Sequence, residues 1–215
     1  ARDENLGIAY GMGLTAEKVA ERWKVSRDDQ DAFALASHQK ALAAQMAGEF
    51  DAEIVAVPVR ENVPDLAAAK VATRTRVVER DEGPRPETTL EGLGKLRPVF
   101  AARGSVTAGN SSQMSDGAGA SILVSERVLK ELGLAPLARF AGFADGGVAP
   151  EIMGVGPIAA IPKVLRQTGV RKEDLDWIEL NEAFAAQSLA VIRDLDLDPG
   201  KVNPLGGAIA LGHPL

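Results

Sequence analysis

The end of the chain holds a histidine in a setting that suits catalysis. His213 lies between Gly212 and Pro214 and follows a glycine-rich apolar stretch, residues 203–212. Glycine permits tight turns and close approach of the backbone to a ligand, so this turn can deliver an imidazole to a site. An imidazole acts as a general acid or base for a second group, and the 215 residues include no cysteine to serve as that group. The alternative is a surface histidine at a turn.

The segment 180–185 is a second candidate, because a predicted strand passes there into a predicted helix. Ligands of open α/β sheets collect at such junctions. The amide of Asn181 could hold a water or an oxyanion, or it could simply cap the helix that follows. Glu182 is either a catalytic carboxylate or a first-turn acid that complements the helix dipole.

The segment 105–117 is a third candidate, since it is dense in small polar residues. Its backbone could approach a ligand closely; the alternative is a helix start whose hydroxyls act as caps. His38, by contrast, lies in a charged helical stretch, and we expect it to be solvated.

The composition excludes several classes of protein and site. With 46% hydrophobic residues the chain can bury one large core or two small ones, and its net charge of −6 gives no overall bias toward nucleic acid or anionic lipid. The lack of cysteine excludes disulfides and thiolate metal sites, and two distant histidines do not predict a metal site. No apolar run reaches about 18 residues, so no membrane span is expected. Residues 1–5 lack an initiator Met and a targeting pattern, which predicts the cut end of a cytoplasmic protein, with an organellar matrix as the alternative.

The first half of the chain begins with two predicted helices. Thr15 caps a helix over residues 16–24, and Ser26 caps a longer helix that ends at Gly48. The β-branched run 52–59 predicts a strand. Residues 60–104 are rich in proline and charge, and they predict a long, partly irregular connection.

Strands and helices alternate after Gly104. The predicted strands span residues 118–124, 137–144 and 176–180 and a segment from 202 onward, and the predicted helices span 126–132, 157–169 and 182–195. This alternation predicts an α/β fold with layers of helices and sheet.

Several of these segments together resemble the thiolase family, coenzyme A-dependent enzymes that cleave or form 3-ketoacyl-CoA. The matching segments fall in family order through the whole chain: residues 12–17, 26–27 with 30–31, 95–98, 106–118, 181–185 and 206–214. The resemblance implies the layered α-β-α-β-α fold of that family, incomplete in this chain. Residues 1–100 would be the later part of the thiolase loop domain and its return to the core. Residues 101–215 would be the C-terminal half, without its final strands and second cysteine loop.

The resemblance also implies roles for six residues. His213 matches the histidine that activates the nucleophilic cysteine and helps to form an oxyanion hole, and Asn181 matches the amide that holds a water in that hole. The other four match positions that bind the coenzyme A substrate: Ser112 at the pantetheine, Arg85 near the adenine, and Met12 and Phe184 in the apolar walls of the channel. The two family cysteines would lie upstream and downstream of this chain. No metal and no covalently bound cofactor are implied.

The function implied by the resemblance is acyl transfer of the thiolase type, as in fatty acid β-oxidation. A 3-ketoacyl-CoA would be cleaved to acetyl-CoA and a shortened acyl-CoA, and the isolated chain would be inactive because both thiols are missing. The variant Tyr10-Gly11-Met12-Gly13 resembles the degradative enzymes more than the acetoacetyl-CoA-forming branch. A non-catalytic CoA-binding or scaffold module is an alternative, and a ketoacyl-synthase relative is a more distant one, against which the histidine motif argues. The resemblance further implies a homodimer or homotetramer for the full-length protein. The net charge predicts no nucleic-acid partner, and the exposed edge of a truncated half-sheet predicts poor behaviour of the isolated chain in solution.

Overall fold

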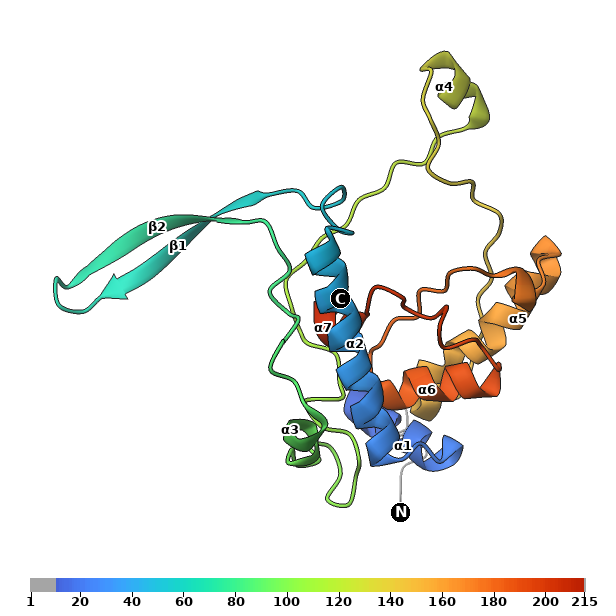
Figure 1. The fold of residues 1–215 in the computed structure, drawn as a ribbon, viewed down its shortest axis with the longest axis horizontal. Helices are drawn as coiled ribbons and strands as arrows, with labels where there is room; N and C mark the ends of the chain where they lie inside the picture. The colour runs from blue at the N-terminus through green and yellow to red at the C-terminus, as the bar shows by residue number, and fades with distance from the viewer. Residues whose placement is uncertain (1–10, 215) are drawn as a thin grey trace.

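The computed structural model describes residues 11–214, which form a helical body from which two long segments project (Figure 1). The predictions drawn from residues 1–5 and from Tyr10 lie outside these residues. Within the described part of the chain, no helix is long and apolar enough to cross a membrane. The elements in chain order are α1 (Met12–Trp23), α2 (Arg27–Ala47), β1 (Val57–Asp65), β2 (Lys70–Val78), α3 (Leu90–Gly94), α4 (Glu126–Glu131), η2 (Pro150–Val155), α5 (Gly156–Thr168), η3 (Lys172–Asp174), α6 (Ala185–Asp194) and α7 (Ala208–Leu211).

The body is built around α1, α2 and α6. Helix α1 packs against η2 and α6, and α2 packs against α3, α6 and α7. Val19 of α1, Ala34 of α2 and Val191 of α6 are completely buried. Burial of such apolar side chains is the main driving force that holds the helices together. Helices from both predicted segments, 1–100 and 101–215, share this packing, and the division between them stays a prediction.

The two N-terminal helices begin in different ways. Ser26 caps α2 by accepting a hydrogen bond of 3.1 Å from the backbone N–H of Asp29, and Gly48 ends the helix at φ 73°, as predicted. Helix α1 instead begins at Met12, so the predicted cap at Thr15 is wrong. Thr15 is buried inside the helix, where its hydroxyl donates to the carbonyl oxygen of Met12 at 2.6 Å.

The connection predicted to be irregular contains a regular hairpin. Strand β1 pairs with β2 in antiparallel register along its whole length, and the pair extends from the body as a ribbon (Figure 1). The predicted strand at 52–59 is therefore wrong in its bounds, and residues 60–78 are not irregular. Pro64 is tolerated within β1 because both strands of a two-stranded ribbon are edge strands. Asp65 closes the turn by accepting hydrogen bonds from two backbone N–H groups of the turn, at 3.1 and 3.0 Å.

Two of the predicted strands are extended but unpaired. Among residues 11–214, the segments 118–124 and 137–144 form no backbone ladder, and Ile122 and Phe140 are 92% and 73% exposed. The prediction of strands is wrong for these segments, because a strand needs a neighbour to satisfy its backbone N–H and C=O groups. Figure 1 shows the stretch as a long excursion that carries α4 near its far end.

The other elements of the second half agree better with the predictions from the sequence. Helix α4 begins after Ser125, which caps it as predicted, and α5 and α6 confirm the predicted helices, although α6 begins at Ala185 and not at 182. The predicted strands at 176–180 and from 202 reduce to one parallel bridge between Ile178 and Val202. This bridge places the end of one segment, just before Asn181, beside the start of the segment that leads to His213.

Candidate active site

The side chains of Asn181 and His213 meet, although 32 residues separate them in the chain. Nδ2 of Asn181 lies 3.0 Å from Nε2 of His213. An amide nitrogen only donates, so in this pairing Nε2 of the imidazole carries the lone pair and Nδ1 the proton. Asn181 is exposed and His213 is half-buried. The alternative that Asn181 caps the following helix is wrong, because the N-cap of α6 is Phe184.

The segment 105–117 runs between two other segments, which we call the two arms of the site: residues 178–184, which include Asn181, and residues 202–213, which end at His213. The backbone N–H of Ser112 donates to the carbonyl oxygen of Ala183 at 3.0 Å, close to Asn181 in the chain. The N–H of His213 donates to the carbonyl oxygen of Gln113 at 2.8 Å. The segment contains no helix, so the alternative of a helix start is wrong. Three parts of the sequence that we singled out separately therefore form one site.

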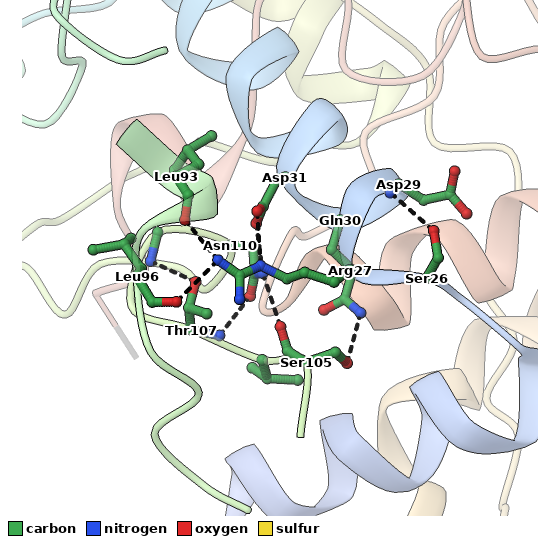
Figure 2. Close-up of polar contacts among 12 residues, drawn as sticks. Ser26, Arg27, Asp29, Gln30, Asp31, Leu93, Leu96, Ser105, Thr107 and Asn110 are labelled. Atoms are coloured by element: carbon green, nitrogen blue, oxygen red, sulfur yellow. Dashed lines mark hydrogen bonds and ion pairs between the residues drawn. The ribbon is translucent and has the colours of Figure 1, made fainter. Parts of the chain in front are cut away.

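A buried polar network fixes the segment 105–117 to α2 (Figure 2). Nδ2 of Asn110 donates to Asp31 at 2.9 Å, and Oδ1 accepts from the backbone N–H of Thr107 at 2.8 Å. Asp31 also pairs with Arg27 at 2.7 Å, and the guanidinium of Arg27 donates to two backbone carbonyl oxygens in and just after α3. Asn110 is completely buried and Asp31 is 4% exposed. The network gives the segment one fixed conformation, because leaving any of these buried groups without a partner would cost free energy.

Glu182 is buried behind the pair and holds the two arms together. Its carboxylate accepts hydrogen bonds from the Ser37 hydroxyl at 2.6 Å, from Nδ2 of Asn203 at 2.9 Å and from the backbone N–H of Ile209 at 3.2 Å. Burial raises the pKa of the Glu182 carboxyl, and the three hydrogen bonds and Lys40 oppose that shift. The interpretation of Glu182 as a first-turn acid of the helix is wrong, because it lies before α6 and points into the interior.

Two glycines allow the arm that leads to His213 to approach α2 and Glu182 closely. Gly206 has φ +84°, and a Cβ there would lie 2.7 Å from the carbonyl oxygen of Ser37 and 2.8 Å from Cβ of Ala41. A Cβ on Gly207 would collide with the carboxyl group of Glu182. The glycine-rich sequence is therefore required for packing as well as for the turn at His213.

Phe184 and the start of α1, which holds Met12, lie close to Phe100, an aromatic residue that the sequence did not single out. The rings of Phe184 and Phe100 make an edge-to-face contact with their centroids 6.1 Å apart. A Cβ on Gly13, the neighbour of Met12, would collide with the Phe100 ring. Phe100 is 41% exposed and Met12 is 49% exposed. These residues form an apolar surface at the start of α1 and α6.

The remaining predicted residues, Ser112 and Arg85, lie next to Gln113. Ser112 is half-buried and is its neighbour in the chain. Arg85 is exposed, and its Nη2 lies 3.5 Å from Oε1 of Gln113. The backbone N–H of Arg85 donates to Nδ1 of His38 at 3.2 Å. His38 is only 5% exposed, so the prediction that it is solvated is wrong. Its burial, with a smaller contribution from the Arg85 charge, lowers the pKa of the imidazole.

No metal site is found in the described part of the chain. Among residues 11–214, no three histidine or carboxylate side chains gather in a way that could hold a metal ion.

Comparison with known proteins identifies the family. Residues 5–127 match the N-terminal domain of thiolase, and residues 134–215 match the C-terminal domain of thiolase. The chain is 53% identical to a 3-ketoacyl-CoA thiolase of Bacillus subtilis, over 95% of this chain and 52% of that protein. It is also 53% identical to the human peroxisomal 3-ketoacyl-CoA thiolase, over 95% of this chain and 47% of that protein.

A solved structure agrees with the sequence comparisons. The crystal structure of the Bacillus anthracis acetyl-CoA acetyltransferase matches with a TM-score of 0.88 and 46% identity, over 94% of this chain and 49% of that one. This match confirms the predicted thiolase-like α/β fold class. The chain spans about half the length of the relatives it matches. The chain belongs to the thiolase family.

Proposed function

We propose that this chain supplies the histidine and the asparagine of a thiolase-type acyltransferase. The observation that carries the proposal is the distance of 3.0 Å between Nδ2 of Asn181 and Nε2 of His213. The relatives named 3-ketoacyl-CoA thiolase support the reaction class. Coenzyme A is a substrate in this reaction, and we propose no bound cofactor.

The proposed reaction has two acyl transfers. In the first, His213 takes the proton of a cysteine thiol, and the thiolate attacks the 3-keto carbon of the substrate. The bond between C2 and C3 breaks, the acyl group stays on the cysteine, and acetyl-CoA leaves after its C2 carbanion takes up a proton from the second family cysteine, which acts as an acid. In the second, the thiol of coenzyme A returns a proton to that second cysteine and attacks the acyl-enzyme, which releases the shortened acyl-CoA, and the first cysteine regains its proton from His213. Neither cysteine is among the 215 residues, so we propose that this chain alone is inactive.

Asn181 acts on the oxygen that becomes negative during the reaction. Its amide nitrogen is a donor, and it lies 3.0 Å from Nε2 of His213. A water held by the amide, together with a protonated Nε2, would donate two hydrogen bonds to a thioester oxygen. Loss of one donor of such an oxyanion hole costs about 10²–10³ in rate. Ser112, Arg85, Met12 and Phe184 are proposed to bind the coenzyme A substrate around this point.

The test is a chimera in which this chain replaces the corresponding residues of the Bacillus subtilis relative. We expect it to cleave acetoacetyl-CoA in the presence of coenzyme A. His213→Ala is expected to abolish turnover, and Asn181→Ala to lower kcat by about 10²–10³. Asn62→Ala is the matched control, because the side chain of that asparagine accepts a hydrogen bond from Thr73 within the distant hairpin. The control should keep the activity of the chimera.

The results separate the proposal from its alternative. A folded chimera without thiolysis, or full activity of the His213→Ala chimera, would contradict the proposed function. An inactive chimera that still binds coenzyme A in calorimetry would favour a non-catalytic CoA-binding module. Thiolysis by the 215-residue chain alone would contradict its proposed inactivity. The direction of the reaction in the cell, the homo-oligomeric state and the compartment stay predictions.

A further inference from the structure

We propose that Gln113 is a positioning residue that sets the orientation of His213 and joins it to the segment that carries Arg85. The proposal rests on the proposed role of His213. The observation behind it is that the amide side chain of Gln113 binds two segments of the site at the same time. Gln113 has no role of its own among the predictions from the sequence, and the proposed reaction gives it none either.

The side chain of Gln113 binds the end of α7. Its Nε2 donates to the carbonyl oxygens of Ile209 at 3.1 Å and Ala210 at 3.0 Å. The last carbonyl groups of a helix have no partner within the helix, so this amide satisfies groups that would otherwise be free. The backbone of Gln113 binds the same region, because its carbonyl oxygen accepts from the N–H of His213 at 2.8 Å. Gln113 thus holds both the helix end and the histidine.

Little else in the local sequence would fix the histidine. Helix α7 has four residues, far fewer than a helix needs to persist by itself. Between α7 and His213 lies Gly212, whose φ of +102° belongs to a region that other residues rarely adopt. The direction of the imidazole therefore depends on contacts that come from outside this stretch, and Gln113 makes three of them.

The same side chain also binds the segment before Arg85. Its Nε2 donates to the carbonyl oxygen of Gly83 at 3.0 Å, and its Oε1 lies 3.5 Å from Nη2 of Arg85. A Cβ on Gly83 would collide with the carbonyl oxygen of Ala210, so the two backbones approach as closely as glycine permits. Gln113 lies where these backbones meet and donates to both. A displacement of this side chain is expected to affect both segments.

The test uses the fact that the chain has two histidines, His38 and His213. The ring nitrogens of the ¹⁵N-histidine-labelled 215-residue chain are observed by NMR at neutral pH, and His38→Asn assigns the two sets of signals. The contact with Asn181 predicts a His213 ring with the proton on Nδ1, and Asn181→Ala is expected to remove this preference. Gln113→Met keeps the side-chain length but removes both N–H donors. We expect it to move the His213 ring signals toward an average of the two neutral tautomers. The His38 signals are expected to shift as well, because Gln113 also binds the segment of Arg85, whose backbone N–H donates to Nδ1 of His38.

Gln45→Met is the matched control. Gln45 is also half-buried and donates from Nε2 to one backbone carbonyl oxygen, that of Asp81, at 2.9 Å. The control should leave the His213 signals unchanged, and a shift as large as that caused by Gln113→Met would overturn the proposal. Unchanged His213 signals in Gln113→Met would also overturn it, as would unchanged signals in Asn181→Ala.

The helical signal in circular dichroism reports whether each variant is folded. If Gln113→Met loses this helical signal, Gln113→Glu is compared in the same way, because it keeps the length and an acceptor and lacks both donors. The readout needs no cysteine and no turnover. An inactive chimera would therefore contradict the proposed reaction without changing this result, and unchanged His213 signals would contradict the role of Gln113 without changing the reaction.

Discussion

The carboxylate of Glu182 accepts a hydrogen bond of 2.6 Å from the hydroxyl of Ser37, which lies 145 residues earlier in the chain. The contact ties the middle of α2 to the residue that follows Asn181. The same carboxylate binds the first turn of α7, so α2, Asn181 and the arm that carries His213 meet at one buried group. The site depends on this group even though the carboxylate is not exposed to a substrate.

Loss of the Glu182 carboxylate should strongly destabilise the chain. Glu182→Ala leaves three buried donors without an acceptor, those of Ser37, Asn203 and Ile209. Each unsatisfied buried donor costs about 1–3 kcal/mol, so we expect the free energy of unfolding to fall by about 3 kcal/mol or more. Urea denaturation measures the change. Glu173→Ala, at an exposed position, is the control and should change the free energy by less than about 0.5 kcal/mol.

Substitution by alanine should destabilise the chain much more at Gly206, next to α7, than at a glycine elsewhere. Gly206→Ala places a Cβ against Ser37 and Ala41 at a φ of +84°, so we expect a loss of about 2 kcal/mol or more and a lower thermal midpoint. Gly94→Ala is the counterpart at the end of α3, where no atom lies within 4 Å of the added Cβ. It should be neutral or stabilise by up to about 1 kcal/mol. Equal midpoints for the two variants would show that the arm is not packed as described.

The buried His38 predicts that stability falls in mild acid. Its pKa is lower in the folded chain than the unfolded value of 6.5, so below this value the unfolded state binds more protons. The free energy of unfolding should therefore decrease as the pH falls through 6.5 toward the folded pKa, and stay flat with respect to this group above 6.5. His38→Asn keeps an acceptor near the position of Nδ1 and cannot be protonated. The urea midpoint of this variant should fall less between about pH 7.5 and about pH 5.5 than that of the parent chain, and an equal fall would contradict the assignment to His38.

Arginine at position 27 should not be replaceable by lysine. Arg27 binds Asp31 and also donates from Nη2 to the carbonyl oxygens of Leu93 at 2.6 Å and Leu96 at 3.1 Å. An ammonium group lacks the planar fork needed to reach all three groups, so Arg27→Lys should cost about 1–3 kcal/mol in urea denaturation.

Arg127→Lys is the control for this substitution. Arg127 also pairs with an acid four residues later, Glu131, but both side chains are exposed. Exposed pairs contribute about 0–1 kcal/mol, so the control should have little effect. Similar losses for the two arginines would mean that the contacts to α3 contribute nothing.

Local signals in the sequence predicted the helices well. The Ser26 cap and the glycine at 48 define α2 through bonds made within a few residues, and such bonds need no distant partner. The segments 118–124 and 137–144 have the apolar character of strands, but the pairing of a strand depends on a neighbour that the local pattern does not specify. The hairpin was missed because its prolines suggested an irregular chain, although they are compatible with edge strands.

The sequence predicted which residues form the candidate site, but it did not predict the contacts that hold them in place. Asn181 and His213 could be selected from their chemistry and from the family resemblance, but their contact follows from the three-dimensional arrangement. His38 accepts a hydrogen bond from a backbone N–H 47 residues away, and Gln113 accepts one from the backbone N–H of His213, 100 residues later in the chain. A lone histidine or glutamine in a sequence carries no sign of such partners.

The short helix α7 has a consequence for the order of folding. Its hydrogen bonds to Gln113, Glu182 and Ser37 all close long loops, and the helix is too short to form in their absence. Helix α2, with its local caps and 21 residues, can begin to form early. We therefore expect α7 to gain structure only late, in the same kinetic step that brings the two arms together. A refolding chain would acquire helix first and the correctly oriented imidazole last.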